Sequence, residues 1–259
     1  MQLTLMYFSP TGTTKKIVAA VGKKFFENML SKTQIVDLTP LAARLRSYAF
    51  DEEDVVIFGA PVYGGRVPPI LKSVFENIQG NGARAVAISV YGNRDYDDAL
   101  LETCDLLGER GFRVCAAGAF IGEHSYSSLV GAGRPDAEDL LAATTFAIAA
   151  YEKVVNGAPI GKPVRGNRPY RELSASMLAP KKAPVFDAEK CVHCRKCVSV
   201  CPVCNIKADL SDCGRCIACA ACVKGCPKGA RFFDDEGVLA ARARLEANCT
   251  ERRSPKFFL

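Results

Sequence analysis

Short apolar segments alternate with longer amphipathic segments over the first 155 residues of the chain. The short segments are rich in β-branched side chains and predict strands, whereas the longer ones repeat their apolar residues with a helical period. Strands are expected at residues 2–8, 34–37, 54–59, 83–90 and 113–120, and helices at 13–30, 69–77, 97–110 and 135–155. Strands and helices that alternate in this way predict an α/β domain with a doubly wound, five-stranded parallel sheet.

The loops that follow the strands are the candidate binding segments, because ligands of open parallel sheets bind at the carboxyl ends of the strands. The first loop is dominated by hydroxyl groups and runs Ser9, Pro10, Thr11, Gly12, Thr13, Thr14. A phosphate at this helix N-terminus would meet free backbone N–H groups, and Gly12 would let the backbone approach it closely. The loop contains neither a P-loop nor a dinucleotide-binding Gly-x-Gly-x-x-Gly. The alternative is a helix cap without a ligand.

This loop resembles the flavodoxin phosphate loop, Thr/Ser-x-Thr-Gly-x-Thr, which Ser9, Thr11, Gly12 and Thr14 match. The resemblance extends over about 155 residues and implies FMN as cofactor, with its ring between the loops after the third and fourth strands. The candidate residues of those loops are Pro61, Val62, Tyr63, Gly64, Gly65, Tyr91, Gly92, Asn93, Arg94 and Tyr96. The tyrosines offer planar surfaces for stacking and the glycines leave backbone N–H groups accessible, although any single tyrosine is equally well explained by packing.

His124 follows the fifth predicted strand and is one of two histidines in the chain. It is a candidate for a hydrogen bond to the flavin or for protonating a substrate. A lone histidine in a loop is more often a surface or structural residue, and both interpretations stay open.

The composition is that of a globular protein, with 49% hydrophobic and 24% charged residues in 259. No apolar run approaches the roughly 20 residues that span a bilayer. The first residues have no basic region or cleavage site of a signal peptide, so we expect a cytoplasmic protein. The charge is uneven, since residues 1–155 carry a net −3 and residues 156–259 carry +9.

Residues 156–185 are rich in proline and basic side chains and show little apolar periodicity, which indicates a linker. A passive spacer is the favoured interpretation. A basic strap laid across the acidic first domain would also fit the uneven charge.

Eleven of the 13 cysteines lie between Cys191 and Cys249. A run of the form Cys-x2-Cys-x2-Cys-x3-Cys-Pro begins at Cys191 and again at Cys216, an offset of 25 residues. In a cytosolic protein, clustered cysteines indicate metal rather than disulfides. Zinc sites commonly use separated Cys pairs, so this spacing favours iron–sulfur clusters over zinc.

The two runs resemble bacterial two-cluster ferredoxins over residues 186–233. That resemblance implies two [4Fe–4S] clusters, in which the fourth cysteine of each run crosses to the other cluster. One cluster would be held by Cys191, Cys194, Cys197 and Cys226, and the other by Cys216, Cys219, Cys222 and Cys201. Cys204, Cys213 and Cys249 are expected not to bind iron, although Cys213 would permit a slipped register.

The combination resembles the EFR1-type flavodoxin–ferredoxin fusion proteins over nearly the whole chain. The expected organisation is a flavodoxin-like FMN domain at 1–155, the linker at 156–185, a small α+β two-cluster ferredoxin domain at 186–233, and a C-terminal helix and tail at 234–259. We expect an electron-transfer flavoprotein that passes electrons between FMN and two clusters, with no catalytic residue and with a ferredoxin or reductase as redox partner. The alternative is a flavin-dependent reductase of a small organic acceptor. A redox sensor is disfavoured, because no nucleic-acid-binding motif is present.

Overall fold

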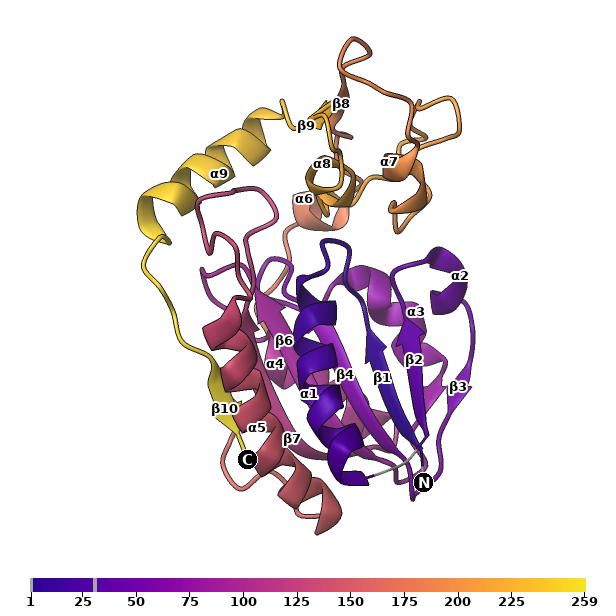
Figure 1. The fold of residues 1–259 in the computed structure, drawn as a ribbon, viewed down its shortest axis with the longest axis vertical. Coiled ribbons are helices and arrows are strands. Elements are labelled where there is room, and N and C mark those ends of the chain that lie inside the picture. Colours follow the sequence, from indigo (N-terminus) through magenta and orange to yellow (C-terminus); the bar gives the residue numbers. More distant parts are fainter. Residues whose placement is uncertain (1, 30–31) are drawn as a thin grey trace.

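The computed structural model describes residues 2–29 and 32–259. Its centre is a sheet with the strand order β10-β7-β6-β4-β1-β2 (Figure 1). Five of these strands are mutually parallel, namely β1 (Leu3–Tyr7), β2 (Thr33–Asp37), β4 (Val55–Pro61), β6 (Arg84–Tyr91) and β7 (Arg113–Ile121). The predicted fold class, a doubly wound α/β domain with five parallel strands, is therefore confirmed.

Helices cover both faces of the sheet. One face packs against α1 (Thr13–Met29) and α5 (Ala137–Val155), and the other against the short helix η1 (Pro69–Leu71), α3 (Lys72–Glu76) and α4 (Ala99–Glu109). Because both faces are covered, β1 is buried along its whole length. Helix α5 begins at a capping box between Asp136 and Asp139. The expected end of the first helix, Leu30, lies outside the described residues.

The connection between β2 and β4 contains a helical turn and one strand of a small two-stranded ladder. The turn α2 (Leu41–Arg44) follows β2, and β3 (Tyr48–Ala49) pairs in parallel with β5 (Ile78–Gln79). These elements lie beside β2 at the edge of the main sheet (Figure 1).

The cysteine-rich region folds above the carboxyl ends of the parallel strands (Figure 1). It contains the antiparallel pair β8 (Val185–Phe186) and β9 (Arg231–Phe232) and two helical turns, α7 (Lys196–Ser199) and α8 (Ala221–Lys224). Its position puts the cysteine runs over the loops from which an α/β domain binds its ligand.

The C-terminal segment returns from the cysteine-rich region to the sheet. Helix α9 (Glu236–Asn248) leads to β10 (Lys256–Phe258), which pairs antiparallel with β7. Phe257 packs between Phe120 and Phe146, with ring centroids 5.4 and 5.0 Å away. The chain expected to end as a tail therefore supplies a sixth strand.

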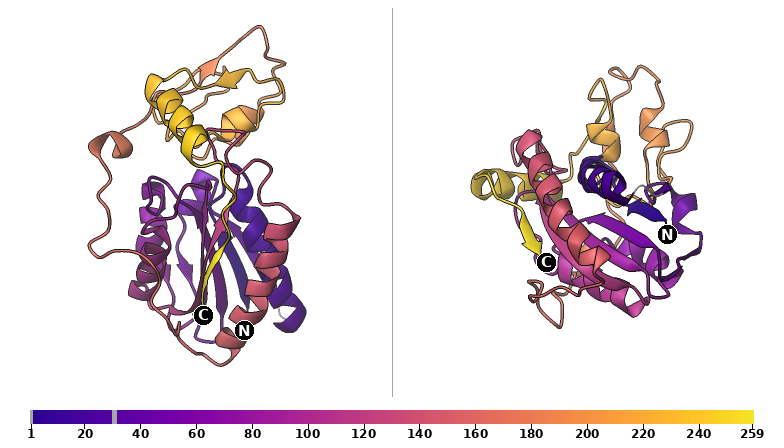
Figure 2. Two further views of the ribbon diagram at one scale, coloured as in Figure 1. Left: turned by 90° about the vertical axis from the view of Figure 1, so that its left-hand side faces the viewer. Right: turned by 60° about the horizontal axis from the view of Figure 1, so that its bottom comes forward.

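Residues 156–184 pass along the outside of the first domain and carry the helical turn α6 (Ala175–Leu178) toward the cysteine-rich region (Figure 2). Within the described residues, none of the helices is both long and apolar enough to cross a bilayer.

Candidate functional site

The loop between β1 and α1 has the conformation and the free polar groups of an anion site. Gly12 has a φ of 86°, and a Cβ built there would meet no atom within 4 Å. Ser9 Oγ accepts a hydrogen bond of 3.0 Å from the N–H of Lys15 and so fixes the loop to the first turn of α1. The hydroxyl of Thr14 is buried and has no partner among the described residues. An unpaired buried hydroxyl beside an open, positive-φ glycine suits a phosphate at the helix N-terminus.

A narrow cavity of about 50 Å³ connects this loop to the other strand-end loops. Eleven of the predicted cofactor residues line it, namely Ser9, Pro10, Thr11, Thr13, Thr14, Pro61, Val62, Tyr63, Tyr91, Gly92 and His124. The loop after β7 adds Gly122, Glu123 and Ser125, which the sequence analysis did not select. We call this space the loop cavity.

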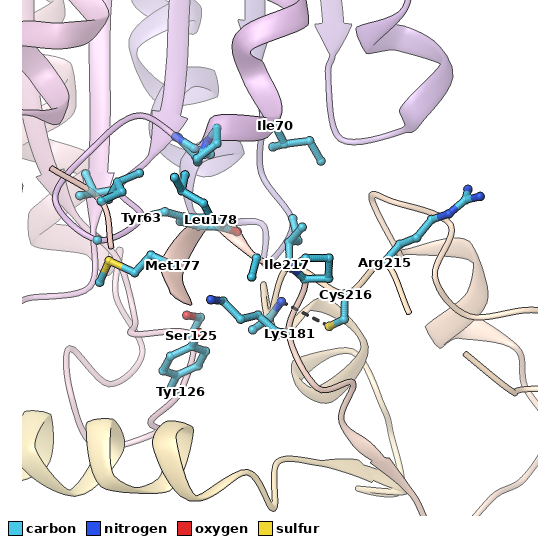
Figure 3. A pocket seen from close by; sticks show the side chains of 18 of the residues that line it. Tyr63, Ile70, Ser125, Tyr126, Met177, Leu178, Lys181, Arg215, Cys216 and Ile217 are labelled. Carbon is cyan, nitrogen blue, oxygen red and sulfur yellow. Dashed lines mark hydrogen bonds between the residues drawn. The ribbon is translucent and has the colours of Figure 1, made fainter. Parts of the chain in front are cut away.

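A second cavity of about 300 Å³ adjoins the loop cavity and shares Val62, Tyr63, His124 and Ser125 with it (Figure 3). Gly64, Tyr126 and residues of the linker and of the cysteine-rich region complete its wall. We call it the interdomain cavity. The two spaces together extend from the hydroxyl-rich loop to the boundary between the domains.

Six predicted cofactor residues do not line the loop cavity. Two of them are Gly12, which lies in the loop between β1 and α1, and Gly64, which lines the interdomain cavity. Gly65 packs so closely on Asp97 that an added Cβ would lie 2.2 Å from its carboxylate. The Asn93 amide donates to the carbonyls of Cys249 and Glu251 at 2.6 and 2.8 Å and so holds the C-terminal segment. Arg94 forms an ion pair with Asp97. Tyr96 is buried and packs against Tyr91 with the two rings tilted by 52° and their centroids 5.6 Å apart.

His124 is held as a neutral hydrogen-bonding group. Its Nδ1 accepts a 3.1 Å hydrogen bond from the N–H of Tyr126. Burial, reinforced by the positive charges of Lys224 and Arg94, lowers the pKa of His124 to about 4. A neutral ring that accepts at Nδ1 carries its proton on Nε2. At pH 7 His124 is therefore a hydrogen-bond donor from Nε2.

The linker is attached to the acidic side of the first domain at several points. Arg168 forms a bidentate ion pair with Asp105, and the N–H groups of Asn167 and Arg171 donate to Asp98 at 2.8 and 2.7 Å. Arg165 lies over the ring of Tyr96, 4.1 Å from its centroid. These contacts support the basic strap rather than the passive spacer that the sequence analysis favoured. The strap also places α6 against the interdomain cavity through Met177 and Leu178 (Figure 3).

The two cysteine runs adopt the same backbone conformation at the offset of 25 residues. Positive φ angles occur at His193 and Arg195 and again at Ala218 and Ala220, directly before α7 and α8. The sulfur contacts repeat as well, because backbone N–H groups donate to Sγ of Cys191 and Cys216 at 3.3 Å and of Cys201 and Cys226 at 3.2 Å. N–H groups that point at sulfur favour thiolates and cluster ligation.

The predicted ligand sets differ in burial. The inner set, Cys201, Cys216, Cys219 and Cys222, lines a single cavity, and all of its members except Cys201 are buried. The outer set, Cys191, Cys194, Cys197 and Cys226, is partly or fully exposed. In the described ranges no three Cys, His, Asp or Glu side chains converge on one metal ion. Thiolates that each bind a separate iron of a four-iron core need not converge in that way.

Two protein-family models match this chain. Residues 4–103 match the model of the flavodoxin domain, and residues 182–203 match the model of a 4Fe-4S binding domain. The chain joins a flavodoxin domain to an iron–sulfur domain. These two domains support an electron-transfer role and imply FMN, an iron–sulfur cluster and redox partners. The second family model includes the first cysteine run and ends before the second.

Solved structures of flavodoxins are similar to the first part of the chain. A flavodoxin from the domain Archaea is 17% identical with a TM-score of 0.43, and the match covers 60% of this chain and 99% of that one. The flavodoxin of Streptococcus pneumoniae TIGR4 is 16% identical with a TM-score of 0.42, and coverage is again 60% and 99%. Flavodoxin 2 from Bacillus cereus is 20% identical with a TM-score of 0.42, with coverage of 59% and 99%. Among curated proteins the comparison finds no match.

Cys219 brings the iron–sulfur domain to the flavodoxin loops. It lines the cavity of the inner set and also the loop cavity, where it is the one lining residue that comes from the iron–sulfur domain. Burial raises the pKa of the Cys219 thiol to about 12. The sequence carried no signal for this contact, because Cys219 and the loops that it meets are more than 90 residues apart in the chain.

Three surplus cysteines line neither the cavity of the inner set nor the loop cavity, namely Cys204, Cys213 and Cys249. Cys204 and Cys213 are exposed, and neither lines the cavity of the inner set. The Cys213 thiol faces the carbonyl oxygen of Cys204 at 3.6 Å. Cys249 lies at the end of α9, where its carbonyl accepts the hydrogen bond from Asn93.

Proposed function

We propose that this protein is an electron-transfer flavoprotein that couples FMN to two [4Fe–4S] clusters and thereby links two-electron and one-electron carriers. When bound, FMN accepts two electrons and releases them singly, whereas each cluster carries one. The observation that carries this proposal is that Cys219 lines both the loop cavity and the cavity of the inner set. Cys219 would then contribute to both the flavin site and the site of the inner cluster.

In this proposal the flavodoxin loops bind and shield the flavin. The hydroxyls of Ser9, Thr11 and Thr14 and the backbone at Gly12 hold the phosphate. Tyr63 and Tyr91 exclude water from the ring, and His124 offers its Nε2 proton as a hydrogen bond. The strap closes the site from the side, because α6 lies against Gly64 of the loop after β4.

The count of two clusters rests on the repeated backbone of the cysteine runs. Each run presents the same positive-φ pair, the same helical turn and the same two N–H contacts to sulfur. Because the two cysteine runs share this backbone geometry, we expect both of them to bind iron–sulfur clusters. The exposed outer set then faces redox partner proteins, and the inner set faces the flavin. Exposed thiolates of this kind persist in the reducing cytoplasm, where we place the protein.

The interdomain cavity favours a second function, the reduction of a small organic acceptor. It holds about 300 Å³ and is lined by Tyr63, His124 and Tyr126 together with apolar residues of the strap (Figure 3). A cavity of this size beside the flavin loops would accept a small molecule. Burial raises the pKa of Tyr126 to about 12, so its hydroxyl stays protonated and able to donate.

Two measurements test these proposals on the anaerobically purified protein. Flavin and iron analysis should give one FMN and about eight irons per chain, and about four irons would contradict the two-cluster count. The reduced protein should then be oxidised by ferredoxin with simple stoichiometry. Multiple turnovers with a small organic acceptor at catalytic protein concentration would favour the reductase instead.

A further inference from the structure

Arg44 is a fully buried arginine of the flavodoxin domain that reaches the iron–sulfur domain. Its Nη1 donates to the carbonyls of Leu38 and Thr39 at 2.6 Å, and its Nη2 donates to the carbonyl of Pro202. Its guanidinium also lies 5.5 Å from the ring centroid of Phe8. Pro202 directly follows Cys201, a member of the inner set. All these partners are neutral, and no carboxylate of the described residues pairs with Arg44.

Arg231 repeats this arrangement on the iron–sulfur domain. It is buried, lines the cavity of the inner set, and donates to the carbonyls of Pro184 and Leu210. Its guanidinium lies 4.7 Å from the ring centroid of Phe186. Its Nε is buried without a partner among the described residues, which also place no carboxylate in an ion pair with it. Arg231 thus lines the cavity of the inner set directly, and Arg44 reaches it through the carbonyl of Pro202, which lines the same cavity. Among the described residues neither of these two buried cations has a carboxylate partner.

A buried charge without a counter-ion is strongly destabilising, so an anion is expected nearby. Four thiolates around a four-iron core leave a net negative charge in both redox states, and the reduced state is the more negative. Burial lowers the pKa of the Arg44 guanidinium, and negative charge on the sulfurs of Cys204 and Cys219 would raise it. At the outer set the neighbouring cations, Arg195 and Lys196, are exposed and so are screened by water and salt.

We propose that Arg44 and Arg231 are the counter-charges of the inner cluster and hold its reduction potential above the value that it would have without them. This rests on the proposed two-cluster function. A fixed cation stabilises the more negative reduced state and therefore raises the potential. Because Arg44 belongs to the flavodoxin domain, docking of that domain and the potential of the cluster nearest the flavin are coupled. Arg44 is thus a positioning residue that acts on the cluster through its charge.

The test compares Arg44→Gln, Arg44→Lys and Arg231→Gln with the wild-type protein in EPR-monitored redox titrations. Removing either charge should lower one cluster potential, and the same cluster should be affected in both variants. The expected decrease is about 59 mV, which corresponds to about a tenfold change in the reduction equilibrium of a one-electron couple. Arg44→Lys should restore most of the shift, because it keeps the charge. Arg46→Gln is the matched control, since Arg46 is exposed two residues away. A purely structural role would leave both potentials unchanged in all variants that retain their iron.

The wild-type protein supplies a second test that does not depend on the folding of a variant. Raising the salt concentration should shift one cluster potential and leave the other unchanged, because buried counter-charges are screened little. Equal shifts of both potentials would overturn the inference. Fewer than eight irons in the wild-type protein would instead contradict the proposed function. Eight irons with unchanged potentials in Arg44→Gln and Arg231→Gln would contradict this inference alone.

Discussion

Cys219 of the iron–sulfur domain and Tyr63 of the flavodoxin domain line the same cavity. Tyr63 is half-buried, and burial of its hydroxyl beside Cys219 and Cys216 raises the pKa of that hydroxyl well above the ordinary value. The two side chains thus lie at the boundary between the domains. Because Cys219 lines both cavities, this boundary offers a short path between the two proposed cofactor sites.

The phosphate loop can be tested by Gly12→Val. A branched side chain at a φ of 86° strains the loop that would hold the phosphate, so the variant should lose its flavin and keep its iron. Flavin and iron analysis of the purified protein measure both. Gly157→Val is the matched control, because Gly157 has a φ of 61° and open space but lies away from the loops. Both substitutions should cost roughly 1–3 kcal/mol in strain, whereas retained FMN in Gly12→Val would refute the phosphate site.

The cysteine register can be tested by single serine substitutions. Cys204→Ser and Cys213→Ser should retain about eight irons per chain, because these exposed thiols lie apart from the inner cavity. Cys219→Ser and Cys194→Ser should each lose about four irons, one from each ligand set. Measuring the number of irons per chain distinguishes the variants of surplus cysteines from the variants of predicted ligands. A loss of four irons from Cys204→Ser or Cys213→Ser would mean that the register is slipped.

The buried His124 predicts a loss of stability in mild acid. Its pKa is about 4 in the folded protein and about 6.5 when unfolded, so the unfolded chain binds more protons between these values. The contribution of neutral His124 to the free energy of unfolding is fully present above pH 6.5 and is lost as the pH drops toward 4. The expected decrease between pH 7 and pH 5 is about 2 kcal/mol. Urea unfolding at both pH values measures the change. The free energy of unfolding of His124→Gln should not show this decrease between pH 7 and pH 5. If the variant and the wild-type protein lose the same free energy, His124 is already protonated in the folded protein.

The strap can be tested by Asp105→Asn. Asp105 accepts hydrogen bonds from the Arg168 guanidinium and the Tyr170 hydroxyl, so the substitution should loosen residues 156–184 at a cost of about 1 kcal/mol. Limited trypsin digestion should cut the variant faster at the arginines of the strap. Glu109→Gln removes an exposed charge from the same helix and should digest like the wild type. Equal digestion of Asp105→Asn would show that other contacts hold the strap.

The sequence was most informative where a contact is encoded locally. Buried β-branched runs and the spacing of Ser9, Thr11, Gly12 and Thr14 depend on near neighbours in the chain. The predicted strand at 113–120 accordingly corresponds to β7, which ends one residue later. The cysteine spacing likewise predicted the local repeat that precedes α7 and α8.

Contacts between distant segments could not be predicted. Arg44 and Arg46 stand two residues apart in an ordinary Ala- and Leu-rich turn, yet one is fully buried and the other exposed. The amide of Asn93 binds carbonyls more than 150 residues away, which no local pattern indicates. Strand β10 has only three residues and forms because β7 offers a free edge. Contacts of this kind form only after the rest of the domain has folded and brought the distant partners together.

The central claim is that the two domains form one electron path through the boundary at Cys219. The most direct test reduces the clusters rapidly under anaerobic conditions and follows the flavin absorbance at several protein concentrations. The account predicts a rate of flavin reduction that does not depend on protein concentration, because transfer is internal to one chain. A rate proportional to protein concentration would contradict it, since the flavin would then receive electrons only from the clusters of other molecules.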